Sequence, residues 1–203
     1  MNKVNRIFSA LLVSLMFSGA AAAATITVDF ESLPGADAVL GTTDDVPTQN
    51  TFIAPIGENY AAIGLHFSQG SLFQDSFFDG NPTNHFISST NPIGTFSVPV
   101  YGIEIDSRSY WNAVLTAYDI HGNILASSVL VNPIAGSGVF SGTVSVSSLV
   151  PIYSFSILPP QSQQILNLDN LVLTVAAAVP EPEQYAMLAL GLMLITVRAR
   201  RKN

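Results

Sequence analysis

The chain has 203 residues, no cysteine, and 14 acidic against 7 basic side chains, which gives a net charge of −7. Residues 25–178 hold 12 of the acidic residues and one basic residue, Arg108, so this stretch alone carries a charge of −11. Such a surface repels nucleic acid, and a chain without cysteine can form neither disulfides nor thiolate metal sites. Because residues 25–178 also lack lysine, Schiff-base and P-loop chemistry are excluded there.

Residues 1–24 have the three-part layout of a secretory signal peptide. Lys3 and Arg6 precede an apolar run over 7–17, and small residues follow over 18–24. The apolar run is shorter than the ~20 residues that a membrane span needs, which argues against a permanent anchor. We therefore predict export through the Sec translocon, with cleavage within or just after Ala20–Ala24.

Residues 25–178 are the size of one domain and consist of short apolar and β-branched segments separated by Gly, Pro, Asn and Asp. Turn residues every ~8 to 15 positions predict an all-β fold, a single β-sandwich. The residues 119–123, which include Gly122, predict the turn of a hairpin. Residues 32–50 are predicted to be a long loop. The predicted strands are 26–31, 62–67, 85–88, 94–98, 102–106, 113–119, 124–131, 142–146, 152–158 and 167–175.

The first and last predicted strands suggest a structural calcium site. Asp29 and Glu31 share the polar face of the first strand, and Asp169 and Asn170 lie in the last. Calcium accepts six to eight oxygen ligands and tolerates irregular loops. If these two strands are neighbours, Asp29 or Glu31 could bind the ion together with Asp169 or Asn170; otherwise these are solvated outward side chains.

Aromatic side chains suggest a second kind of site. Tyr110 and Trp111 follow Ser107-Arg108-Ser109 in a predicted loop, and flat rings pack against sugar faces. Tyr110 and Trp111 are therefore candidates for binding a glycan, although aromatic residues in such positions are more often part of a core.

No catalytic pattern stands out, so we expect no enzymatic activity. The three histidines, His66, His85 and His121, lack the local spacing of a metal pair. No serine has the Gly-x-Ser-x-Gly form of a hydrolase nucleophile. A pair of carboxylates for glycoside hydrolysis could arise in any acidic domain, and the sequence assigns none.

The C-terminal segment, 179–203, has three parts. Pro180, Glu181 and Pro182 are followed by an uncharged run over 184–197, and then by Arg198, Arg200, Arg201 and Lys202. As a helix the uncharged run would be about 21 Å long, which is short for a bilayer but sufficient if the flanking arginines snorkel. The basic end is expected to stay on the cytoplasmic side of the inner membrane, which orients residues 25–178 outward.

This tail resembles the PEP-CTERM sorting signal of Gram-negative bacteria. The resemblance implies recognition by an exosortase and cleavage near Pro180, Glu181 and Pro182. It also implies a transient anchor in the inner membrane before delivery to the cell surface or extracellular matrix. It further implies co-occurrence with exopolysaccharide production, and so a role in the matrix or biofilm.

Four segments of the body resemble the jelly-roll domains that are often found upstream of this tail: 30–34 (FESLP), 98–103 (VPVYGI), 115–119 (LTAYD) with Gly122-Asn123, and 168–171 (LDNL). These are mostly packing and turn positions, so they bear on fold and not on activity. The sequence therefore predicts an exported structural or adhesive matrix protein. The alternatives are a carbohydrate-binding module, then a secreted glycan-active enzyme.

Overall fold

The computed structural model describes residues 23–48, 54–74, 85–110, 112–130, 140–159 and 164–176. They belong to one compact unit, Ala23–Ala176. The predicted signal peptide, up to residue 22, and the predicted sorting tail lie outside the described residues. Among the described residues there is no helix long and apolar enough to cross a membrane.

The regular elements of the described residues are β-strands, with one short 3₁₀ helix, η1, at Ala61–Ile63. The strands are β1 (Ala24–Val28), β2 (Ser32–Leu33), β3 (Val46–Pro47), β4 (Ala54–Pro55), β5 (Leu65–Phe67), β6 (Ser71–Gln74), β7 (His85–Ser89), β8 (Ile93–Ser109), β9 (Ala113–Tyr118), β10 (Ile124–Leu130), β11 (Phe140–Leu158) and β12 (Leu166–Val175).

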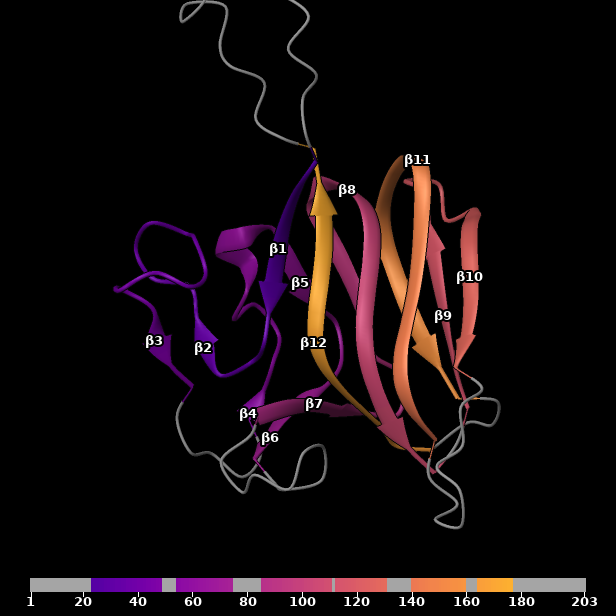
Figure 1. Cartoon of the computed structure of the whole chain (residues 1–203), viewed down its shortest axis with the longest axis horizontal. Coiled ribbons are helices and arrows are strands. Elements are labelled where there is room, and N and C mark those ends of the chain that lie inside the picture. Colours follow the sequence, from indigo (N-terminus) through magenta and orange to yellow (C-terminus); the bar gives the residue numbers. More distant parts are fainter. Residues whose placement is uncertain are drawn as a thin grey trace, which may run out of the picture. The chain divides into compact units, whose positions relative to one another are not determined.

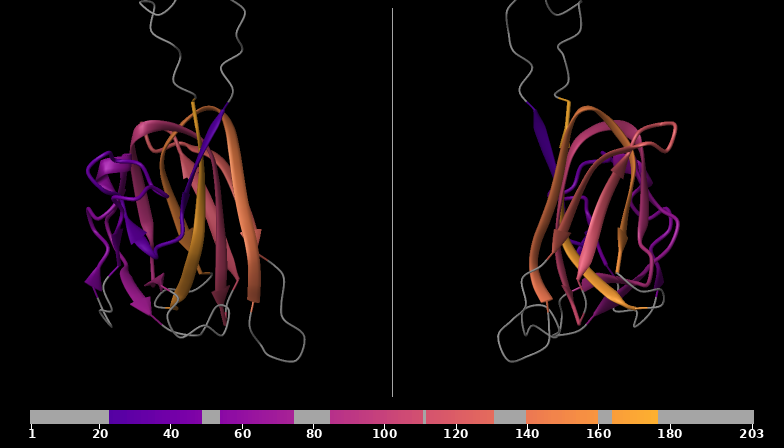
Figure 2. Two further views of the ribbon diagram at one scale, coloured as in Figure 1. Left: turned by 60° about the vertical axis from the view of Figure 1, so that its left-hand side comes forward. Right: turned by 90° about the vertical axis from the view of Figure 1, so that its right-hand side faces the viewer.

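The strands form a sandwich of two layers (Figures 1 and 2). One layer contains β1, β12, the second half of β8 and the first half of β11, and all neighbouring pairs are antiparallel. The other layer contains β5, the first half of β8, the second half of β11, β9 and β10. β7, β6 and β4 continue from the start of β12. The predicted all-β sandwich is thus confirmed.

Two long strands connect the layers, which corrects the predicted strand list. The predicted strands 94–98 and 102–106 are one strand, β8, and 142–146 and 152–158 are one strand, β11. Both strands bend at the same level, where Ser147 pairs with Gly102 and Ile152 pairs with Val100. Each was predicted as two strands because the bend interrupts the alternation of buried and exposed residues, although the backbone pairing continues through the bend.

The N-terminal third also differs in detail from the prediction. The first strand ends at Val28, so the predicted strand 26–31 is too long, and the predicted loop 32–50 contains the short β2–β3 pair. The predicted strand 62–67 begins with η1 and becomes a strand only after Gly64, whose φ is 81°. The predicted hairpin turn after β9 is confirmed, with Gly122 at φ 80°.

A single hydrophobic core fills the space between the two layers. In β8, Ile103 and Ile105 are buried while Glu104 between them is exposed, as the two-residue period of a strand requires. From the facing layer, Phe155 packs edge-to-face against Phe67, with 6.2 Å between ring centroids, and stacks on Phe96 at 5.5 Å. Aromatic pairs of this geometry add to the stability gained from buried area alone.

Candidate functional site

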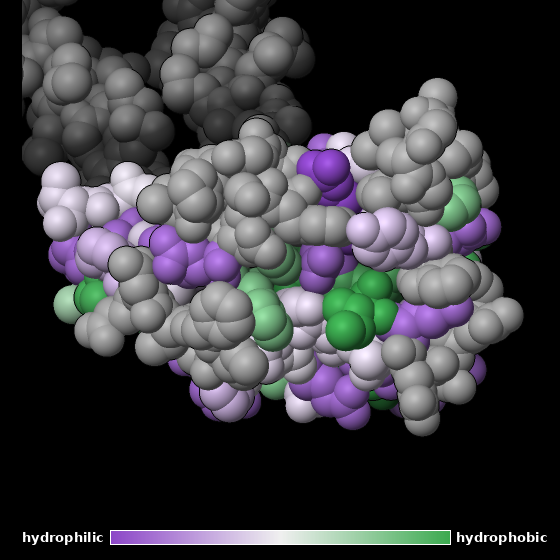
Figure 3. All heavy atoms as spheres, turned by 90° about the horizontal axis from the view of Figure 1, so that it is seen from below, coloured by the Kyte–Doolittle hydropathy of each residue, from purple (hydrophilic) through white to green (hydrophobic). Residues whose placement is uncertain are grey.

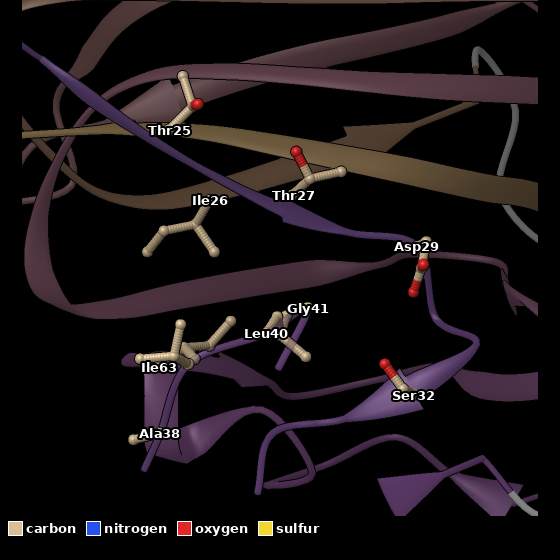
Figure 4. A pocket seen from close by; sticks show the side chains of 10 residues that line it. Thr25, Ile26, Thr27, Asp29, Ser32, Ala38, Leu40, Gly41 and Ile63 are labelled. Atoms are coloured by element: carbon tan, nitrogen blue, oxygen red, sulfur yellow. The ribbon is translucent and has the colours of Figure 1, made fainter. Parts of the chain in front are cut away.

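A groove of about 460 Å³ lies along β1 (Figure 4). β1 pairs with β12 through Ala24–Val28 and Leu171–Val175, and among the described residues no strand pairs with its other edge. Ile26 projects from β1 toward Leu40 and Ile63, whereas Thr25 and Thr27 project from the other side of the strand. The lining residues are Thr25, Ile26, Thr27, Asp29, Ser32, Ala38, Val39, Leu40, Gly41 and Ile63.

The wall of the groove opposite β1 is a loop that aspartates hold in shape. Asp45 accepts hydrogen bonds from the backbone N–H of Gly41 (2.7 Å) and Thr42 (3.2 Å). The Thr42 hydroxyl donates to Asp44 (2.6 Å), and the backbone N–H of Asp37 also donates to Asp44 (3.2 Å). These donors hold the pKa of the Asp44 carboxyl below its ordinary value. The carboxylates therefore order a loop that has little regular structure of its own.

At the end of β1 the chain makes a sharp turn that directs Asp29 to the groove and Phe30 to the core. The backbone N–H of Glu31 donates to the Asp29 carboxylate (3.0 Å), and Phe30 has a φ of 63°, which is rare for a bulky residue. Phe30 is fully buried and packs edge-to-face on Tyr60, with 5.7 Å between ring centroids. The Thr48 hydroxyl donates to the Phe30 carbonyl (2.8 Å). Packing and this hydrogen bond hold the strained backbone in place.

Tyr60 joins the core to the lining of the groove. It is fully buried, and its hydroxyl donates to the carbonyl of Ser32 (3.1 Å), one of the lining residues. Burial raises the pKa of the Tyr60 hydroxyl, and the negative charges of Asp29 and Glu31 raise that pKa further. Tyr60 therefore stays protonated and remains a donor across the physiological pH range.

Glu31 does not point freely into solvent, as its place in a predicted alternating strand had suggested. Its carboxylate accepts the backbone N–H of His85 (2.7 Å) and contacts His85 Nδ1 (2.7 Å). His85 is buried, and within the part of the chain that the structure describes its Nε2 has no hydrogen-bond partner. Glu31 thus connects the turn after β1 to the start of β7.

The four residues of the predicted calcium site are partly brought together. β1 and β12 are neighbours, and Val28, the last residue of β1, pairs with Leu171. Asp29 and Asn170 are the next residues beyond this pair, one on each segment. Asp169, however, is buried and accepts the backbone N–H of Asn170 (2.8 Å). Among the described residues no group of three or more His, Asp or Glu side chains is placed to hold a metal ion. A calcium site at Asp29, Glu31, Asp169 and Asn170 stays a prediction.

The other predicted site residues lie away from the groove or outside the described part of the chain. Tyr110 follows β8 directly and is exposed. Trp111 and the sorting residues Pro180, Glu181 and Pro182 lie outside the described residues.

Sequence reasoning missed most of the groove. Leu40 lies in the predicted loop 32–50 and Ile63 in the predicted strand 62–67, and no local pattern places either of them beside Ile26, so the groove depends on tertiary structure. One local signal was present, since Asp37, Asp44 and Asp45 lie among glycines and threonines, a composition typical of loops ordered by side-chain hydrogen bonds.

No family model matches this chain, and no curated protein matches it. Among solved structures, it is similar to the K1 cleaved adhesin domain of Lys-gingipain from Porphyromonas gingivalis, at 12% identity and a TM-score of 0.39, over 76% of this chain and 99% of that one. It is also similar to a family 29 carbohydrate-binding module, CBM29-2, at 9% identity and a TM-score of 0.35, over 79% and 99% of the two chains. A third is an arabinose-bound GH51 α-L-arabinofuranosidase, at 13% identity and a TM-score of 0.36 over 56% of this chain. This chain spans about a quarter of that enzyme's length (24%).

Proposed function

We propose that this chain is an exported protein that an exosortase sorts from a transient inner-membrane anchor to the cell surface or extracellular matrix, where its sandwich has a structural or adhesive role. The observation that carries the proposal is the order of the segments. One compact unit, Ala23–Ala176, lies between a signal-like segment and a tail with the Pro180-Glu181-Pro182 motif. Its acidic surface is suited to remaining soluble outside the cell and to neutral or cationic partners.

Intact-mass spectrometry of the protein from its native host tests the sorting step, with and without the exosortase. The wild-type strain should yield a chain that ends near residues 180–183, and the deletion strain should yield a chain that retains Arg200. If both strains retain the full tail, the protein is a permanent inner-membrane protein and the proposal is wrong.

A second candidate function, binding of exopolysaccharide, is supported by the groove along β1. The groove combines the apolar side chains of Ile26, Leu40 and Ile63 with the carboxylate of Asp29, and its volume is in the range of small-ligand sites. A sugar presents an apolar ring face together with hydroxyls that can donate hydrogen bonds to a carboxylate. This chemistry suits a neutral glycan better than an anionic one, because the body carries a charge of −11.

Binding of purified host exopolysaccharide can be measured with three variants. Asp29→Asn should weaken binding, whereas Asp119→Asn, which changes a similar turn on another loop, should not. Trp111→Ala reports on the alternative site at Tyr110 and Trp111. Loss of binding only in Trp111→Ala would transfer the function to that site, and binding unchanged in all variants would exclude both sites.

We also propose that residues 25–178 bind a ligand without catalysing a reaction. A single carboxylate whose removal abolished glycan cleavage, while the fold survived, would overturn this proposal.

The calcium site is tested by comparing the melting temperature of the protein in calcium with that in a chelator. A higher melting temperature in calcium that is lost in Asp169→Asn would support the site, and equal melting temperatures would exclude it.

A further inference from the structure

Four exposed aliphatic side chains lie at two places where the chain reverses direction. We call these four side chains, Leu149, Val150, Ile120 and Ile124, the apolar tip. Leu149 is 100% exposed and Val150 is 50% exposed, and both lie at the bend of β11. Ile120, which is 65% exposed, lies in the turn between β9 and β10, and Ile124, which is 66% exposed, is the first residue of β10. Leaving side chains of this kind in water is unfavourable, so several of them on turns at one end indicate a contact surface.

The two turns lie at the same end of the sandwich (Figures 1 and 2). Pairing agrees with this placement, because Tyr118 at the end of β9 is opposite Ile124 in β10 and opposite Ser154, which closely follows the bend of β11. Local hydrogen bonds shape both turns. The backbone N–H of Val150 donates to the Ser148 hydroxyl (3.1 Å), and Asp119 accepts the N–H groups of His121 and Asn123 (2.8 Å each). The aliphatic side chains are therefore held outward by ordered turns.

The turns of the apolar tip carry little charge. In residues 119–124 and 147–151 the charged or titratable side chains are Asp119 and His121. The Asp119 carboxylate also accepts the side-chain N–H of Asn123 (2.8 Å), and these donors hold the pKa of Asp119 below its ordinary value. On a body with a net charge of −11, two turns with four aliphatic side chains and one internally bonded carboxylate are suited to an uncharged interface.

The chain leaves the sandwich at this same end. Ala24 pairs with Val175, so the compact unit begins and ends beside the bends of β8 and β11 (Figure 1). Between Ala176 and the predicted membrane segment, which starts at Gln184, there are seven residues (177–183). Fully extended, they bridge less than ~30 Å. β12 has ten residues and is about 33 Å long, so a tether of this length favours bringing the near end of the sandwich to a bilayer over the far end.

We propose that the apolar tip, Leu149, Val150, Ile120 and Ile124, contacts the headgroup region of a zwitterionic bilayer while the protein is held by its tail. This inference rests on the proposed function, which supplies the membrane anchor. Four aliphatic side chains bind a membrane weakly, but a tether raises their effective concentration at the surface enough to orient the body. Cleavage near Pro180–Pro182 removes the tether and so releases the tip.

The far end of the sandwich provides a matched control. Ile165, just before β12, is 55% exposed and is thus a comparable aliphatic side chain at the end away from Ala24 and Ala176. Figure 3 shows this far end, where hydrophobic residues lie among polar ones. If exposure alone caused membrane contact, the two ends would behave alike.

Because the chain has no cysteine, single labels can be introduced cleanly. The full-length chain would be reconstituted in phosphatidylcholine vesicles as Leu149→Cys, Ile165→Cys and Leu190→Cys, each carrying an environment-sensitive fluorophore. Quenching by lipids with nitroxides at the headgroup and at the acyl chain reports depth. We expect headgroup-level quenching at position 149, acyl-level quenching at 190 and none at 165. Protease cleavage in the linker should abolish the quenching at 149.

The outcomes separate the two proposals. Absence of quenching at position 190 would mean that the tail does not insert, which contradicts the proposed anchor. Quenching at 190 with equal signals at 149 and 165 would overturn the apolar tip and leave the anchor intact. A second variant, Val150→Ser with the label at 149, should reduce the quenching at 149; unchanged quenching would also contradict the proposed contact.

Discussion

Glu31 and His85, 54 positions apart in the chain, are joined by two contacts of 2.7 Å, from the backbone N–H and from Nδ1 of His85 to the two oxygens of one carboxylate. The pair holds the turn that ends β1 against the first residue of β7. The Glu31 side chain is partly exposed, whereas that of His85 is only 6% exposed, so removing the carboxylate leaves buried polar groups without a partner.

We therefore expect Glu31→Ala to lower the free energy of unfolding by about 1 to 3 kcal/mol, the usual cost of orphaned buried donors. Glu58→Ala is the control, because Glu58 makes a similar pair with His66 at the surface, where the side chains are 72% and 31% exposed. That change should cost less than about 1 kcal/mol. Urea denaturation of both variants checks the prediction, and equal losses of stability would contradict it.

Tyr60 should be the source of a loss of stability at alkaline pH. Burial raises its pKa above the ordinary value of 10.0, so the unfolded chain releases the hydroxyl proton at a lower pH than the folded chain does. The contribution of Tyr60 to stability is therefore fully present below about pH 10 and decreases as the pH rises above it. Denaturation between pH 8 and 11 should show this decrease in the wild type, and a smaller one in Tyr60→Phe. Parallel curves for the two proteins would refute the assignment.

The wall of the groove offers a test of backbone strain. Ala38 has a φ of 57° and Gly41 has a φ of 84°, both in the left-handed region that glycine tolerates best. Ala38→Gly should raise the free energy of unfolding by up to about 1 kcal/mol, and Gly41→Ala should lower it by about 1 kcal/mol. An added Cβ at Gly41 meets nothing within 4 Å, so its cost is conformational. Thermal unfolding measures both changes. A destabilising effect of Ala38→Gly would contradict the backbone strain inferred at Ala38.

Gly94 is required by the packing of Phe155. An added Cβ at position 94 would overlap the Phe155 ring, which is fully buried between the layers. Gly94→Ala should therefore lower the free energy of unfolding by about 1 to 3 kcal/mol. In a double-mutant cycle with Phe155→Leu, the two costs should be less than additive, because the smaller side chain removes the clash. Additive costs would indicate that Gly94 is needed for another reason.

Much of the fold follows from local pattern. The alternation in 113–118 and 167–175 predicts β9 and β12, and Asp119 with Gly122 predicts the turn after β9. These predictions succeed because a strand with one buried face carries a two-residue period wherever it lies. The end of β1 was predicted less well, because the turn at Phe30 keeps an alternating sequence while the backbone leaves the sheet.

The sequence by itself determined the all-β class, most strand positions and the acidic character of the body, because composition and short-range periodicity encode them. The tertiary structure alone decided that β8 and β11 each run through both layers, that Glu31 meets His85, and that Ile26, Leu40 and Ile63 line one groove. These features depend on the pairing register and bending of strands that are distant in the chain. The local sequence of one strand does not indicate which distant strand it pairs with.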